Sequence, residues 1–421
     1  MIETKFKQTE VGQIPMDWDV YCLETISDIK TGPFGSSLHA SDYVRYGTPI
    51  ITVEHLGEPY ILHATNIPLV GERDKKRLAQ YSLRTGDIVY SRVGSVDRNS
   101  VVTEQEEGWL FSGRLLRVRN TFGYNASYLG YHLNSYSAKQ RIISAAVGLG
   151  MPSINTKILG EHSVILPKDI NEQARIAEAL SDVDKLIREL DTLIEKKRSI
   201  MQGTMQELLT ARRRLPEFNE QWKSMTFEDI GALIRGVGFS PEQSSHKHKR
   251  GSMPLLRANN IKNNSLIFNE LIYVSDDCVK HTQVLREADI LICTANGSSN
   301  LVGKSVIIPQ IENFTFGAFM TILRCHDKRI AKYIIYFMRS SSYRKQITDL
   351  LCGSAINNIN SRQLYTISVQ CPSNIDEMNE IASVLSDMDT EIEELEAKRD
   401  KYIAVRQGMM QQLLTGKIRL I

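Results

Sequence analysis

The sequence predicts an α+β protein in which one unit occurs twice: two pseudo-symmetric strand-rich domains separated by a pair of long antiparallel coiled-coil helices. Three observations predict this fold. Matching residues recur at an offset of 205, as in Leu180-Ser181-Asp182 and Leu385-Ser386-Asp387. Each copy ends in a long heptad pattern, and each begins with short β-branched runs. A repeat of this length indicates two similar domains that can take pseudo-symmetric positions.

The composition is that of an ordinary globular protein. Charged residues make up 24% and hydrophobic residues 42% of the 421 residues, and a net charge of +2 neither requires nor excludes a nucleic-acid partner. No apolar run approaches the roughly 20 residues of a membrane span, and the first residues lack the apolar core of a signal peptide. We therefore expect a cytoplasmic protein without membrane contact. The six cysteines form no CxxC pair and are expected to be reduced core residues.

The second part of each copy predicts a long helix. Residues 167–215 and 372–420 align without a gap and share 22 identities in 49 positions. Apolar residues follow steps of four and three, which is the spacing of a coiled-coil seam. In the first helix, expected over residues 170–212, they are Ile176, Leu180, Val183, Ile187 and Leu190; in the second they are Ile381, Leu385, Met388, Ile392 and Leu395.

Two heptad helices of similar length in one chain most simply pack against each other, and a two-fold arrangement makes them antiparallel. Lys197, Arg399 and Arg406 occupy seam positions, where polar residues fix register and partner. Capping residues precede both helices: Asp169 or Asn171, and Asn374 or Asp376. The alternative is that each helix fills an unrelated core in its own domain.

The first part of each copy predicts a strand-rich domain with one or two helices. Short β-branched runs predict strands at 49–53, 87–90 and 101–103, and residues 128–146 and 331–351 predict one helix each. The repeat offset falls to 202 at Leu83 and Leu285 and returns to 205 at Val101 and Val306. The loop around Gly297 is therefore expected to be three residues longer in the second copy. Similar scaffolds with different loops indicate two related binding sites with different specificities.

The motifs that would indicate nucleotide binding, methyl transfer or metal binding are absent or have the wrong spacing or structural context. Gly297 and Gly303-Lys304-Ser305 resemble a phosphate loop, but five residues separate the glycines instead of four, and a strand is expected where a helix is required. None of the 12 prolines is adjacent to another, so the Asn/Asp-Pro-Pro-Tyr/Phe site of an amino-methyltransferase is absent. His246, His248 and His281 lack the spacing of metal ligands. We expect no catalytic residue, metal or cofactor on this chain.

Polar and partly basic residues recur in the predicted loops of both copies. Arg with guanine and Asn with adenine can bond two base-edge atoms at once, whereas Ser, Thr and Lys more often hold phosphates. The candidate DNA-contacting residues of the first copy are Thr52, Glu54, His55, Ser91, Arg92, Ser95, Arg98 and Arg114. Those of the second copy are Arg257, Asn259, Asn260, Thr294, Asn296, Ser298 and Lys304. Taken singly, each is equally well explained as an ordinary hydrophilic loop residue.

Signatures spread over the whole chain point to one family. They are the opening Thr9-Glu10-Val11-Gly12-Gln13-Ile14-Pro15-Met16-Asp17-Trp18, Gly-x-Pro-Ile-Ile-Thr at 47–52, Met-Pro-Leu-Leu-Arg at 253–257, the helix opening Glu172-Gln173-Ala174-Arg175-Ile176-Ala177, and the ending Leu413-Leu414-Thr415-Gly416-Lys417-Ile418-Arg419-Leu420. With these residues the chain resembles the specificity (S) subunit of type I restriction–modification enzymes. One departure is Ala288, which stands where the first copy has Gly86.

The resemblance implies that each globular part is a target recognition domain, at 1–166 and 214–371, which reads one half of a split site in double-stranded DNA. It implies spacer helices at 167–213 and 372–421 that dock two methyltransferase (M) subunits. Restriction (R) subunits would complete the complex. S-adenosylmethionine, ATP and Mg are then expected on those partner subunits, and no cofactor on this chain.

Two other interpretations of the sequence remain. A cytoplasmic coiled-coil scaffold with two peptide- or protein-binding domains would show the same repeat. An enzyme with an unfamiliar site would also lack the motifs tested above. Neighbouring genes for a methyltransferase and an ATP-dependent nuclease would favour DNA recognition.

Overall fold

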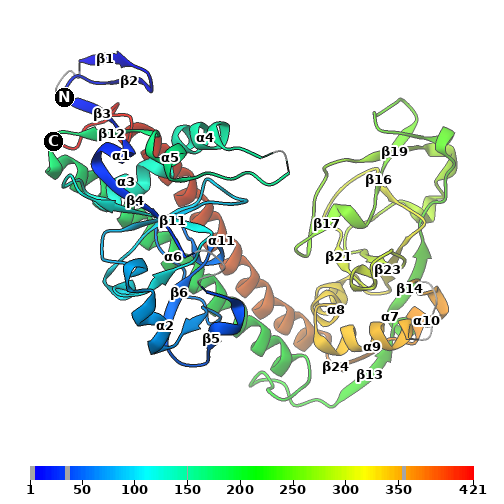
Figure 1. Ribbon diagram of the computed structural model, residues 1–421. Coiled ribbons are helices and arrows are strands. Elements are labelled where there is room, and N and C mark those ends of the chain that lie inside the picture. Colours follow the sequence, from blue (N-terminus) through cyan, green and yellow to red (C-terminus); the bar gives the residue numbers. More distant parts are fainter. Residues whose placement is uncertain (1–4, 34–37, 149, 353–356) are drawn as a thin grey trace. The chain divides into compact units, whose positions relative to one another are not determined.

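The computed structural model describes residues 5–33, 38–148, 150–352 and 357–421 (Figure 1). The chain divides into two compact units. Unit 1 comprises residues 1–191 and 397–421, and unit 2 comprises residues 192–396. The division crosses both long helices, α6 (Ile170–Leu208) and α11 (Ile375–Leu413). Each unit therefore contains one globular part and a half of each long helix.

Unit 1 is centred on an antiparallel sheet in the order β4-β11-β8-β9. Its strands are β4 (Ser27–Thr31), β8 (Ile88–Ser91), β9 (Asn99–Val101) and β11 (Leu115–Asn120). Side chains alternate between its two faces, as the period of a strand requires. Ile88 and Tyr90 pack with the helices, whereas Val89 and Leu115 pack on the opposite face with residues of a second sheet. Both faces are buried, which explains the nearly continuous apolar run in β8.

The second sheet of unit 1 has the order β10-β6-β7-β5. Its strands are β5 (Tyr43–Val44), β6 (Thr48–Ile51), β7 (Leu69–Val70) and β10 (Leu110–Phe111). β10 pairs with β6 in parallel, and the other pairs are antiparallel.

Unit 2 repeats both sheets. The first has the order β14-β23-β20-β21 and the second the order β15-β19-β16-β22, in which β16 and β22 pair in parallel as β6 and β10 do. The strands are β14 (Gly231–Arg235), β15 (Ser244–Ser245), β16 (Ser252–Leu256), β19 (Ile272–Ser275), β20 (Ile290–Cys293), β21 (Ser305–Ile307), β22 (Thr315–Phe316) and β23 (Met320–Cys325). The predicted α+β class and its repeat are confirmed.

Smaller elements complete both units. In unit 1 they are β1 (Phe6–Thr9), β2 (Gly12–Pro15), β3 (Trp18–Cys22), α1 (Leu23–Ile26), α2 (Glu72–Arg77), α5 (Thr156–Gly160) and β12 (Ser163–Pro167). In unit 2 they are β13 (Trp222–Thr226), α7 (Phe227–Ile230), β17 (Ile261–Lys262), β18 (Ser265–Leu266), α10 (Ser361–Tyr365) and β24 (Ser368–Pro372). β3 pairs with β12, and β13 pairs with β24 in the same antiparallel manner.

The helix predicted in each globular part is in fact two helices. Unit 1 has α3 (Ala126–Leu133) and α4 (Tyr136–Ala145), and unit 2 has α8 (Ala331–Met338) and α9 (Ser341–Leu351). Ser135 and Ser340 break them, because each adopts an extended backbone and its hydroxyl accepts a hydrogen bond from the amide three residues later.

One strand boundary and one loop length also differ from the prediction. β9 ends at Val101, where a strand was predicted to begin, because Thr103 instead caps a short 3-10 turn. The loop between β20 and β21 is four residues longer than that between β8 and β9, not three. The equivalent bonds run from Ser91 N to Arg98 O and from Cys293 N to Lys304 O, at 2.8 Å in both units.

The long helices run antiparallel within each unit, since higher residue numbers in one meet lower numbers in the other. The ion pairs are Asp184–Arg406 (2.5 Å) and Asp191–Arg399 (3.5 Å) in unit 1, and Lys197–Glu391 (2.5 Å) in unit 2. The three polar seam positions are thus used in pairing. Because both helices contribute to each core, the alternative of two unrelated helix cores is wrong.

The predicted seam residues lie on the packed faces of these helices. Buried among them are Ile176, Leu180, Leu190, Ile381, Leu385 and Ile392, and partly buried are Val183, Ile187, Met388 and Leu395. The helices end at Leu208 and Leu413, and their caps are Asp169 and Asn374, whose side chains accept from the amides two residues later at 2.9 and 2.8 Å.

A matched ion pair anchors the start of each long helix. In unit 1 the carboxylate of Glu172, which is buried, accepts hydrogen bonds from Arg419 at 2.6 and 2.8 Å and from the indole of Trp18 at 3.1 Å. This contact raises the pKa of Arg419 above its ordinary value. In unit 2 the buried Glu377 accepts from Arg214 at 2.7 and 2.8 Å. In each unit the segment that follows one long helix therefore holds the first turn of the other.

Candidate nucleic-acid interface

Two matched 3-10 turns follow β6 and β16, and they carry predicted residues of both copies. In unit 1 the imidazole Nδ1 of His55 accepts from the amide of Thr52 at 3.1 Å. In unit 2 the amide oxygen of Asn260 accepts from the amide of Arg257 at 2.9 Å. His55 and Asn260 are buried, and burial lowers the pKa of His55. Both side chains cap their turns from inside the protein, and a DNA contact by either residue stays a prediction.

The same turns project one residue outward. Glu54 in unit 1 and Asn259 in unit 2 occupy equivalent positions, and both are exposed. Thr52 and Arg257, which begin the turns, are partly buried. The matched scaffold thus presents a carboxylate in one unit and a carboxamide in the other, which differ in charge and in hydrogen-bonding capacity.

The basic residues at the end of the β8–β9 and β20–β21 loops are held by their own domains. Arg98 donates to the carbonyl of Leu56, and Lys304 donates to the carbonyl of Ile261. Both acceptors are the residues that end the 3-10 turns. These cations fasten the loop to the turn, and β21 follows Lys304 directly, so the loop does not open a helix as a phosphate loop does.

Two further predicted residues are inside the protein. Ser91 is fully buried at the end of β8, and the hydroxyl of Thr294 donates to the carbonyl of Phe319 at 3.1 Å. Both side chains therefore face the protein interior, and a DNA contact by either residue stays a prediction. Arg92 is partly buried, and its guanidinium lies 3.4 Å from the carbonyl of Gly113.

The remaining predicted residues lie near or at the surface. Ser95 and Arg114 of unit 1 and Ser298 of unit 2 are exposed. Asn296 is partly buried, and its side-chain oxygen accepts from the amide of Ser298 at 3.0 Å. Hence the β20–β21 loop, the longer of the two, is ordered by its own asparagine.

Unit 2 brings three of these residues together at one pocket. Arg257, Asn259 and Asn296 line a pocket of about 660 Å³ whose other walls are mainly apolar and include Phe239 and Phe319. An apolar concavity with a few converging polar groups is the usual form of a binding site. Phe239 and Phe319 are not among the residues predicted from the sequence, all of which are polar.

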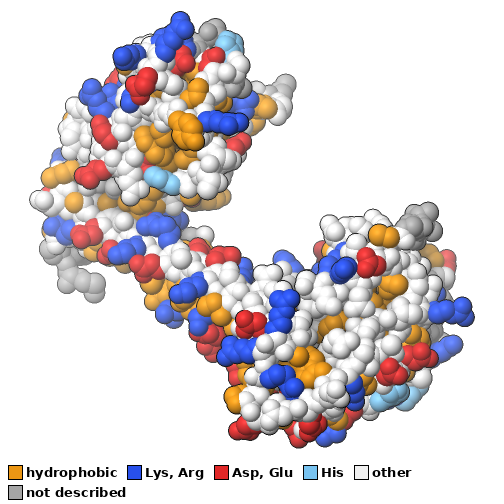
Figure 2. Space-filling model, turned by 90° about the horizontal axis from the view of Figure 1, so that it is seen from below, with side chains coloured by type: hydrophobic (Ala, Val, Ile, Leu, Met, Phe, Trp, Pro, Cys, Tyr) orange, Lys and Arg blue, Asp and Glu red, His pale blue; other side chains and the backbone are white. Residues whose placement is uncertain are grey.

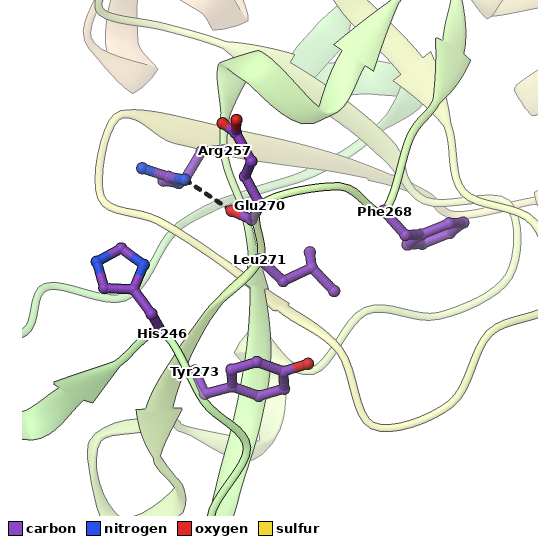
Figure 3. A pocket seen from close by; sticks show the side chains of 6 residues that line it. All are labelled: His246, Arg257, Phe268, Glu270, Leu271 and Tyr273. Carbon is purple, nitrogen blue, oxygen red and sulfur yellow. Dashed lines mark hydrogen bonds between the residues drawn. The ribbon is translucent and has the colours of Figure 1, made fainter.

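A second pocket of unit 2 shares Arg257 in its lining. It has a volume of about 610 Å³, and its lining includes His246 and Tyr273 (Figure 3). The guanidinium of Arg257, which lines both pockets, donates to the carbonyl of Glu270 at 2.9 Å. His246 begins a run of exposed residues, His246-Lys247-His248-Lys249-Arg250. Exposed cations beside a polar pocket are suited to phosphate contacts.

Charge is mixed on the part of the surface that Figure 2 displays. Figure 2 shows basic and acidic side chains interspersed on the displayed face of each unit, with apolar areas between them.

Among the described residues, no group of three or more His, Cys, Asp or Glu side chains could hold a metal ion. All six cysteines are free thiols, and Cys293 and Cys371 are buried. Cys22 and Cys352 were predicted to be core residues but are exposed.

No helix within the described ranges is long and apolar enough to cross a membrane. Residues 1–4, on which the prediction about the N-terminal segment partly depends, lie outside those ranges.

The two-fold repeat is also found when the chain is compared with known protein families. The family model of the type I restriction modification DNA specificity domain matches twice, at residues 15–197 and 219–403. The chain belongs to this family. It is therefore a specificity subunit with two target recognition domains, and not a catalytic subunit.

Individual relatives agree with this assignment. The chain is 26% identical over 433 residues to a protein of Methanocaldococcus jannaschii named provisionally as the MjaX specificity subunit, covering 99% of this chain and 97% of that protein. It is 31% identical over 199 residues to the EcoKI specificity subunit of Escherichia coli, covering 47% of this chain and 43% of that subunit. The crystal structure of the S subunit from M. genitalium shares the fold, with a TM-score of 0.62, 15% identity, and coverage of 97% and 98%.

Proposed function

We propose that this specificity subunit reads a split site in double-stranded DNA, one half with each unit, for a type I restriction–modification complex. One observation carries the proposal: the two units present chemically different exposed residues, such as Glu54 and Asn259, on matched backbone turns. A protein that bound two copies of one target would have no need for this difference. Two readers on one scaffold explain it.

The proposal assigns roles to the rest of the chain. The target recognition domains extend over 1–166 and 214–371, and the spacer segments 167–213 and 372–421 dock two methyltransferase subunits. The restriction subunits join this assembly. S-adenosylmethionine, ATP and Mg are bound by those partners, and the complex works in the cytoplasm. The paired helices support this division, because both contribute to the core of each unit and so form a constant frame.

The test is a methylation map with variants confined to one unit. Arg257→Ala and Asn259→Ala should relax recognition within one half-site, because they remove polar groups from the unit 2 pocket. The loss of one bidentate base contact costs about 1–3 kcal/mol of discrimination. Glu54→Ala is the matched control and should relax the other half-site alone. A map in which either variant alters both halves would contradict the proposal.

A further inference from the structure

The turn that precedes β11 in unit 1 and the turn that precedes β23 in unit 2 occupy the same place in the repeat. Each follows the strand that pairs in parallel with β6 or β16. The carbonyl of Arg114 accepts from the amide of Arg92 at 2.9 Å, and the carbonyl of Phe319 accepts from the amide of Thr294 at 2.9 Å. Arg114 and Phe319 are therefore equivalent residues with different side chains.

Phe319 is held outward although it is apolar. Its carbonyl accepts hydrogen bonds from the amide and hydroxyl of Thr294 and from the amide of Ala295, while 69% of the residue is exposed. Fully burying a phenylalanine side chain stabilises by about 1.5–3 kcal/mol relative to leaving it in water. Single exposed apolar residues are common, but this one lies at a pocket that also contains Phe239 and Asn259. A ligand that covers this pocket would bury the ring.

A second equivalent pair lies on the preceding 3-10 turns. Asn259 of unit 2 lines the same pocket as Phe319, and Glu54 of unit 1 occupies the matching position. Unit 2 therefore combines an amide with an aromatic ring, and unit 1 combines a carboxylate with a guanidinium. Each combination is electrically neutral, so neither adds net attraction to phosphates. The difference between the units is one of base-edge chemistry.

We propose that these two pairs of residues read one base pair at the matched position of each half-site: A·T in unit 2 and G·C in unit 1. This inference rests on the proposed function. In the major groove Asn bonds adenine at N6 and N7, and an aromatic ring contacts the thymine methyl group. Arg bonds guanine at O6 and N7, and Glu accepts from the cytosine amino group. Asn259 and Phe319 thus suit the two bases of one pair, and Glu54 and Arg114 suit those of the other.

The first experiment exchanges the pairs in the full-length chain within its complex. The double variant Asn259→Glu, Phe319→Arg should change one position of the unit 2 half-site from A·T to G·C in the methylation map. The matched variant Glu54→Asn, Arg114→Phe should make the opposite change in the unit 1 half-site. Unchanged half-sites in both active variants would overturn the inference.

The second experiment starts from the wild-type complex, uses none of the double variants, and therefore also decides the question if those variants are inactive. Duplexes carry deoxyuridine in place of each thymine of the unit 2 half-site in turn, which removes one methyl group. Binding should weaken about four-fold at a single position, the value of one buried carbon group, and Phe319→Ala should abolish that dependence. If the complex binds every substituted duplex as tightly as the unsubstituted one, the inference is overturned.

The two failures are distinguishable. If the wild-type complex shows no sequence preference that depends on this chain, the proposed function is wrong. If each unit controls one half-site but neither the exchanges nor deoxyuridine affects the matched position, only the base-pair assignment is wrong.

Discussion

Unit 1 contains three ionisable side chains, two buried and one partly buried, at positions where unit 2 has uncharged ones. They are His132, Arg141 and His162 in unit 1, and Phe337, Gln346 and Ile367 at the matching positions of unit 2. Burial lowers the pKa of His132 to about 3 and that of His162 to about 4, and the charge of Arg141 adds to both shifts. Nε2 of His132 accepts from the amide of Ile165 at 3.3 Å, which requires the neutral ring. We predict that unit 1 is acid-labile and that unit 2 lacks this lability.

The direction in which pH changes the stability of unit 1 follows from proton uptake on unfolding. Above the ordinary histidine pKa of about 6.5, both states are neutral and the full stability is present. As the pH falls toward the folded pKa values, the unfolded chain binds protons that the folded unit excludes, so the free energy of unfolding falls by about 1.4 kcal/mol per pH unit for each histidine. Between pH 7.5 and pH 5, His132 and His162 should each contribute a loss of about 2 kcal/mol.

Hydrogen exchange at the two pH values separates the units. Amides of β8 and β11 report on unit 1, and those of β20 and β23 report on unit 2, after correction for the intrinsic exchange rate. The double variant His132→Phe, His162→Ile copies the unit 2 residues and should remove most of the acid-dependent loss in unit 1. Equal losses in both units of the wild type, or an unchanged loss in the double variant, would refute the reasoning.

Two further predictions concern the ends of the long helices. Arg419→Ala leaves the carboxylate of Glu172 buried without its cation and should destabilise unit 1 by about 3–5 kcal/mol, whereas Arg214→Ala should destabilise unit 2. Urea unfolding followed by hydrogen exchange measures both effects, and a variant that destabilises both units equally would contradict this prediction. Ala211→Gly should stabilise by up to about 1 kcal/mol because residue 211 has a φ of 56°. The matching Gly416→Ala should lower the free energy of unfolding by about 1–3 kcal/mol, because its Cβ would lie 2.2 Å from a proline ring carbon. Thermal unfolding that ranks the stabilities of these two variants in the opposite order would rule this prediction out.

The long helices could be predicted because their signal is local. Heptad residues such as Leu180 and Leu385 mark the packed faces, and the exact 205-residue period requires the same element twice. Their ends were less accessible to prediction. The first helix stops at Leu208 because the chain turns through Ala211 and brings Arg214 to the start of the other long helix, a contact 163 residues distant in sequence.

The candidate site was predictable only in part. Glu54 and Asn259 were found because polar residues in matched loops are a local pattern. The capping role of His55 and Asn260 was not predicted, although a polar side chain three residues after the start of a turn is a typical capping position. Phe319 was missed because its place beside Asn259 depends on the parallel pairing of β16 and β22, which joins segments about 60 residues apart.

The central claim, that two units of one chain read two half-sites independently, is tested most directly by a methylome of a host with the wild-type gene, without the gene, and with Asn259→Ala or Glu54→Ala. We predict a split motif that disappears without the gene and that loses specificity in one half with Asn259→Ala and in the other half with Glu54→Ala. A motif that persists without the gene, or whose two halves change together in either variant, would contradict the account.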